Sequence, residues 1–157
     1  MADNGCYLVP TFTVFTFHAT QGNPYAVAEA NDFRRQHIET VQKAMAAGVK
    51  VVAGTDAGGW EHGNNARELE LLVGAGMTPM EALVAATGWA AGCLDMEDRI
   101  GTLKPGKLAD LIVVDGDPLA DIAILQDKQR ISLVMKEGQI YLDQLTAGYD
   151  PDQLNLL

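Results

Sequence analysis

A short apolar run bounded by glycines constrains the fold of this chain more than any other feature. Residues Gly48 to Gly58 read Gly-Val-Lys-Val-Val-Ala-Gly-Thr-Asp-Ala-Gly, so that Asp56 follows the run. A run of this length and composition is typical of a strand buried on both faces of a parallel sheet, and such sheets bind ligands at the carboxyl ends of their strands. We therefore predict that Asp56 binds a metal or accepts a proton. An Asx-turn or a helix cap is the structural alternative.

The segment before this run predicts one βαβ unit. Tyr7 to Val14 is rich in β-forming residues and predicts a strand. Tyr25 to Ala47 has apolar residues at steps of three and four, and Gly48 stands where a helix would end. With Val49 to Ala53 as the second strand, the order is strand, helix, strand, for which a right-handed crossover is expected.

Helices are predicted after Asp56. Asn64 is a candidate cap for a helix from Asn65 to Gly74, in which Glu68 and Glu70 suit the positive end of the helix dipole. Thr78-Pro79-Met80-Glu81 has the spacing of a capping box, with proline at the first helical position, and predicts a helix through about Ala86. A short continuation past Gly88 is expected to end near Leu94.

The pattern changes to short β runs after Asp98. The runs are Leu111 to Val114, Ile131 to Met135 and Gln139 to Leu142, and the last two read as a hairpin across Glu137-Gly138. The fold class is therefore α/β. We expect three parts: residues 1–97, residues 98–145, and a polar tail over residues 146–157.

Composition excludes several classes of protein. The chain has 21 acidic and 11 basic residues, a formal net charge of -10, and no cluster of lysine and arginine, which argues against a nucleic-acid partner. No segment reads as a membrane span or signal peptide, so we expect a cytoplasmic protein. Cys6 and Cys93 form no zinc or disulfide pattern, and the histidines have no local metal-binding spacing.

Five motifs follow one another along the chain: Val9-Pro10-Thr11, the Gly48 to Gly58 segment, Asn65 to Leu72, Gly76 to Leu83 with Ala85-Ala86-Thr87, and Ile100 to Val114. In this order they resemble the carboxyl-terminal part of metal-dependent amidohydrolases, in particular the imidazolonepropionase-like and Xaa-Pro dipeptidase branch. The resemblance covers the chain to about Leu142.

The resemblance implies a fold and a chemistry. Residues 1–97 would form the seventh and eighth strands of a (β/α)8 barrel with their helices, and residues 98–145 part of a small β-sandwich. Asp56 would match the aspartate that binds the catalytic metal and acts as general base. The cofactor would be a divalent metal, with zinc expected first. The substrates would be small molecules with an amide, a cyclic amide or an Xaa-Pro dipeptide bond.

The chain also departs from the family pattern. The family's His-x-His pair, its lysine or glutamate ligand and two further histidines belong to barrel segments that are absent here, whereas a catalytic zinc takes about three protein ligands. We therefore expect a fragment that is inactive alone. The alternative is a non-catalytic structural module that self-associates or binds a complementary fragment through unpaired strand edges. A third hypothesis is a small doubly wound domain, although no Gly-x-Gly-x-x-Gly follows either strand.

The histidines are weaker candidates than Asp56. His18 follows the proposed seventh strand, and His62 lies in the loop after Asp56, so each is a candidate for the substrate side of the site. The alternative for His62 is an ordinary loop residue. His37 lies on the apolar stripe of its predicted helix and is expected to be a packing residue whose polar atoms are satisfied. Trp60 could line a pocket or cover the barrel mouth.

Overall fold

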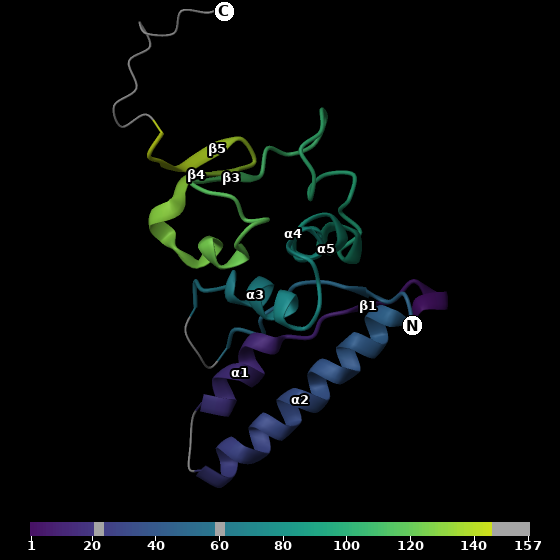
Figure 1. The fold of residues 1–157 in the computed structure, drawn as a ribbon. Coiled ribbons are helices and arrows are strands. Elements are labelled where there is room, and N and C mark those ends of the chain that lie inside the picture. The colour runs from purple at the N-terminus through teal and green to yellow at the C-terminus, as the bar shows by residue number, and fades with distance from the viewer. Residues whose placement is uncertain (21–23, 59–61, 146–157) are drawn as a thin grey trace, which may run out of the picture.

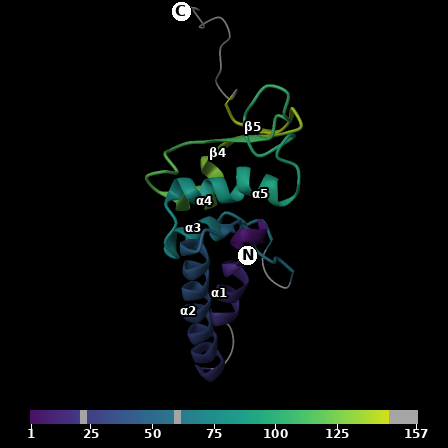
Figure 2. The ribbon, with the colours of Figure 1, turned by 90° about the vertical axis from the view of Figure 1, so that its right-hand side faces the viewer.

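The computed structural model describes residues 1–20, 24–58 and 62–145. Its elements are η1 (Ala2–Asn4), β1 (Tyr7–Leu8), α1 (Phe12–Thr20), α2 (Pro24–Ala46), β2 (Lys50–Val51), α3 (Arg67–Gly74), α4 (Pro79–Ala86), α5 (Gly88–Cys93), β3 (Leu111–Val114), η2 (Ile122–Gln126), η3 (Lys128–Arg130), β4 (Ile131–Lys136) and β5 (Gln139–Asp143). Figure 1 and Figure 2 show three levels: the β3–β5 sheet, then α3, α4 and α5, then α1 beside α2. The predicted tail and Trp60 lie outside the described residues.

The first sheet is parallel and consists of β1 and β2. Tyr7 lies opposite Lys50 and Leu8 opposite Val51, and α2 connects the two strands. Val51 is fully buried, as the apolar run predicts. The ladder is shorter than the predicted strands, and within the described residues each strand has one neighbour to pair with.

The prediction of a strand from Tyr7 to Val14 was wrong beyond Leu8. Phe12 begins the helix α1 instead, after a turn at Thr11 whose φ is 51°. Aromatic and β-branched residues of this kind form strands when they pack on a pleated surface. Here they pack against α2, which lies alongside α1 in both side views (Figures 1 and 2). Tertiary packing therefore overrides the local preference.

The core lies where α1 and α2 meet α3 and α4. Buried side chains from all four helices, from β2 and from η2 contribute to it: Phe12, Val41, Val51, Leu69, Leu72, Ala82, Ala85 and Ile122. The capping box of α4 is present as predicted, with Thr78 and Glu81 each accepting a hydrogen bond from the other's backbone N–H. The predicted cap at Asn64 is wrong, because α3 begins at Arg67 and makes no side-chain cap hydrogen bond.

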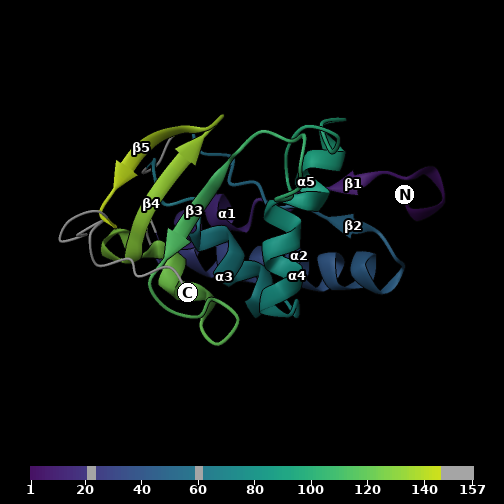
Figure 3. The ribbon, with the colours of Figure 1, turned by 90° about the horizontal axis from the view of Figure 1, so that it is seen from above.

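The second sheet is antiparallel, in the order β3-β4-β5. Figure 3 shows the three strands side by side above the helices. β4 and β5 form the predicted hairpin, in which Lys136 pairs with Gln139. No helix within the described residues is long and apolar enough to span a membrane.

Candidate functional site

Asp56 lies beyond the carboxyl end of β2. The chain leaves the strand through Val52 and Ala53 and turns at Asp56, whose φ is 50° and whose side chain is exposed. Thr11 occupies the same left-handed region after β1. Aspartate tolerates this conformation, whereas a β-branched threonine is a real outlier that its surroundings must hold. Both parallel strands thus lead into unusual turns at the edge where ligands of such sheets bind.

Close packing joins these two turns. A Cβ atom added to Gly54 would overlap Cγ1 of Val9, so the segment before Asp56 lies against the segment before Thr11. A side chain at position 54 would therefore require the Val9 side chain to shift. The motif Gly54-Thr55-Asp56 therefore combines close approach with an acidic residue.

Glu68 is the residue that sequence reasoning missed. Its side chain is fully buried, and its carboxylate accepts hydrogen bonds from the backbone N–H of Phe12 at 2.9 Å and of Thr13 at 2.8 Å. The hydroxyl of Thr13 donates a third, at 2.5 Å. Glu68 thus caps the amino-terminal end of α1 although it belongs to α3. The sequence had predicted only an interaction with the dipole of its own helix. Glu68 lies four residues before Leu72, so both side chains are on the same face of α3. This spacing was the sequence feature that could have indicated burial of Glu68.

Burial dominates the electrostatics of Glu68. Removal from water raises the pKa of its carboxyl group above the ordinary value, and the hydrogen bonds from Thr13 and Phe12 oppose that rise. The pKa of the nearby Glu70 is shifted in the opposite direction. Hydrogen bonds from Arg67 and then Gln126 lower the pKa of Glu70, which is only partly buried.

A cavity of about 560 Å³ opens beside these segments. Its polar wall comes from the end of β2 and the start of α3, with Thr55, Asn65 and Glu68. Its apolar wall comes from α3, α4, β3 and the segment after β3: Leu69, Leu83, Ala86, Ile112, Val114, Pro118 and Leu125. The volume is in the range of small-molecule pockets.

The two candidate histidines lie on different elements. His18 is in the last turn of α1, so it does not lie just past a strand as predicted, because a helix occupies that segment. Its side chain is exposed and makes an edge contact with Phe17. His62 is exposed in the loop before α3. A Cβ atom on the next residue, Gly63, would lie 3.7 Å from Nζ of Lys128, so this loop approaches η3.

His37 packs between helices α1 and α2, as its place on the apolar stripe predicts. Its ring lies 4.9 Å from that of Phe12, 4.8 Å from that of Phe15 and 6.2 Å from that of Phe33. Burial lowers the pKa of His37. Its Nδ1 atom has no hydrogen-bond partner among the described residues, so the prediction of satisfied polar atoms is wrong for this nitrogen, which faces aromatic rings.

The described residues do not fit a complete metal centre. Among residues 1–20, 24–58 and 62–145, no three histidine, cysteine, aspartate or glutamate side chains are grouped so that they could hold an ion. A catalytic zinc usually takes three protein ligands. Asp56 could supply one of them, so a centre at this edge would need ligands from elsewhere.

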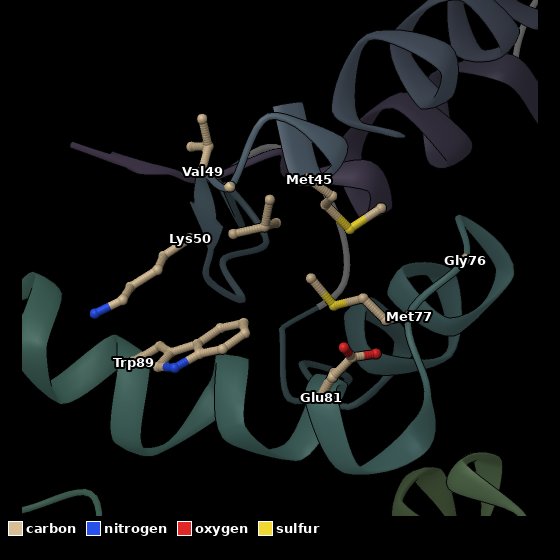
Figure 4. Close-up of a pocket in the computed structure, with 9 residues that line it drawn as sticks. Met45, Val49, Lys50, Gly76, Met77, Glu81 and Trp89 are labelled. Atoms are coloured by element: carbon tan, nitrogen blue, oxygen red, sulfur yellow. The ribbon is translucent and has the colours of Figure 1, made fainter. Parts of the chain in front are cut away.

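A second cavity, of about 300 Å³, lies at the other end of β2. Figure 4 shows Met77 and the indole of Trp89 below β2 and Met45 beside it, with Lys50 and Glu81 on opposite sides. The carboxylate of Glu81 is already engaged in the capping box. This cavity lies beside the amino-terminal end of the strand, away from Asp56.

The family model described as "Amidohydrolase family" matches residues 1–141 of this sequence. The chain belongs to the amidohydrolase family. Curated relatives of this amidohydrolase include the ochratoxinase of Aspergillus niger, which is 36% identical over 107 residues, or 67% of this chain and 22% of that protein. The imidazolonepropionase of Pyrobaculum arsenaticum is 42% identical over 64 residues, or 41% of this chain and 16% of that protein.

Solved amidohydrolase-type structures also resemble the chain. A Xaa-Pro dipeptidase with methionine bound in its active site has a TM-score of 0.79 and 38% identity, covering 90% of this chain and 36% of that one. The Aspergillus niger ochratoxinase structure has a TM-score of 0.78 and 31% identity, covering 90% and 33%. The chain therefore spans about a fifth of the matched curated relatives and about a third of these structures.

Proposed function

We propose that this chain is the carboxyl-terminal part of a metal-dependent amidohydrolase that cleaves a carbon–nitrogen bond. In this proposal, residues 1–97 are the last two strands of a (β/α)8 barrel with their helices, and residues 98–145 are part of a β-sandwich. The single observation that carries it is the placement of Asp56 beyond the carboxyl end of a buried parallel strand, within a chain of this family. Active sites of such barrels are built at that end of the strands.

Asp56 has two proposed roles. Its carboxylate would be one ligand of a divalent ion, with zinc expected first, and would accept a proton from water at the ion. Such an ion supplies a water whose pKa is lowered towards neutrality. Residues outside this chain would supply the other ligands, so the isolated chain is expected to be inactive. His62 and His18 remain low-ranked candidates for substrate contact.

The substrate class follows from the names of the relatives. These names include an imidazolonepropionase and a Xaa-Pro dipeptidase. We propose a small molecule with an amide, a cyclic amide or an Xaa-Pro dipeptide bond as substrate.

A second candidate role is association without catalysis. The antiparallel sheet exposes large apolar side chains, with Ile112 51%, Ile140 49% and Tyr141 64% exposed. The parallel sheet has only two strands within the described residues. Exposed edges and apolar faces favour pairing with another chain, so a homo-oligomer or a complex with a complementary fragment is proposed.

Complementation tests the catalytic proposal. The chain would be mixed with the part of a related Xaa-Pro dipeptidase that precedes the matched region, and bound metal and dipeptide hydrolysis would be measured. We expect neither activity nor stoichiometric metal with either piece alone, and both with the mixture. Asp56→Asn should abolish hydrolysis in the mixture, whereas the exposed control Asp98→Asn should not. A mixture with full hydrolysis after Asp56→Asn would overturn the proposed role.

Light scattering on the chain alone tests association. We expect a dimer or larger species. A monomer over a hundredfold range of concentration, about 2.7 kcal/mol in association free energy, would count against the exposed edges as binding surfaces.

A further inference from the structure

We propose that Glu68 is a positioning residue that fixes the turn after β1 against the end of β2, and through it the backbone that carries Asp56. The proposal rests on the proposed function only for the role of Asp56. The mechanical link itself is a property of this chain and can be measured without metal or substrate.

The first link joins Glu68 to the turn after β1. Its two carboxylate oxygens accept hydrogen bonds from the first two residues of α1, Phe12 and Thr13. Thr11, immediately before them, is a β-branched residue at a φ of 51°. Such a conformation persists only where its surroundings hold it. The hydrogen bonds to Glu68 provide that restraint at the next two residues.

The second link joins this turn to the end of β2. The side chain of Val9 packs against Gly54 so closely that a Cβ atom there would overlap it, and Glu68 lines the same cavity as Ala53, Gly54 and Thr55. The buried carboxylate is therefore hydrogen-bonded to the start of α1, just after the turn that follows β1, and faces the same cavity as the segment that follows β2. Displacement of the first turn would move Val9 and release Gly54.

The chemistry requires a carboxylate rather than an amide. One oxygen of Glu68 accepts from Phe12 and the other accepts twice from Thr13, so both oxygens face donors only. Glutamine would direct its NH₂ group at one of these donors and leave both unpaired in a buried site.

The test compares the folded chain with three variants, Glu68→Gln, Thr13→Val and the control Glu70→Gln. Glu70 lies on the same helix but pairs with Arg67 and Gln126. The measurements are amide hydrogen exchange at Phe12, Thr13 and Ala53, and the chemical shift of the backbone amide of Asp56 at one fixed pH. The N–H of Ala53 donates to the carbonyl of Ala85, which makes it a protected reporter at the end of β2.

Glu68→Gln should speed exchange by about tenfold at Phe12, Thr13 and also Ala53, because one lost buried hydrogen bond is worth about that factor. It should also shift the backbone amide signal of Asp56, because the backbone at the end of β2 moves. Thr13→Val removes only the hydroxyl donor and should give a smaller change at the same positions. If Glu68→Gln does not fold, the Thr13→Val variant alone tests the proposal. Glu70→Gln should change none of these signals. Unchanged exchange at Ala53 and an unchanged backbone amide signal of Asp56 in a folded variant would overturn the proposal, whatever happens at Phe12 and Thr13.

Discussion

Thr13 gives both its backbone N–H and its hydroxyl hydrogen to one carboxylate oxygen of Glu68, at 2.8 Å and 2.5 Å, although the two residues are 55 positions apart in the sequence. The contact ties the first helix after β1 to the first helix after β2. It also places an acidic group, fully buried, at the positive end of α1.

Glu68 should make the stability of the chain depend on pH. Because burial raises its pKa in the folded state, the folded chain holds this proton more tightly than the unfolded chain does. The stabilisation that Glu68 contributes to the folded state is present in full below the pKa of its carboxyl group in the unfolded chain. It is lost as pH rises through the pKa of that group in the folded chain. Urea unfolding should show this loss in the wild type and not in Glu68→Gln. If the free energy of unfolding of the wild type, minus that of Glu68→Gln, rose with pH instead of falling, the raised pKa of Glu68 would be contradicted.

His37 should affect the pH dependence of stability with the opposite sign. Its lowered pKa means that the folded chain prefers the neutral ring, so stability is present above the ordinary histidine pKa and is lost as pH falls through the folded value. His37→Phe should remove this acid-side loss. Thr16→Val is the matched control: it removes another buried oxygen without a partner among the described residues, but no titrating group. It should raise stability by about 1 kcal/mol at every pH.

Gly54→Ala should destabilise the chain by about 1–3 kcal/mol, since the new methyl group overlaps Cγ1 of Val9. Val9→Ala removes that atom, so the double variant should recover part of the loss. Thermal unfolding of the two single variants and the double variant measures this coupling. Strict additivity would mean that the two side chains do not meet.

Thr78→Ala should cost about 1 kcal/mol, because it removes the side-chain acceptor that caps α4. Denaturant unfolding gives the value. Thr78→Ser keeps the acceptor and should remain close to the wild type; an equal loss in both variants would show that the hydroxyl is not the cause.

Local signals were read correctly where neighbours in sequence determine the structure. The capping box of Thr78 and Glu81 and the turn at Glu137-Gly138 need only a few consecutive residues, so their spacing was sufficient. The apolar run around Val51 also predicted a buried strand, and the motif order predicted the family.

The start of α1 and the burial of Glu68 could not be predicted in the same way. Phe12 to Phe17 has the composition of a strand, yet it forms a helix because a distant carboxylate caps it and α2 covers it. An acidic residue in the first turn of a helix, such as Glu68, is usually solvated. Here it is buried, because the start of α1 supplies hydrogen-bond donors to its carboxylate. By itself, the sequence determined the family, the buried strand, the local caps and the hairpin. Tertiary structure alone decided α1 and Glu68, since partners far apart in the chain meet only once the core has formed.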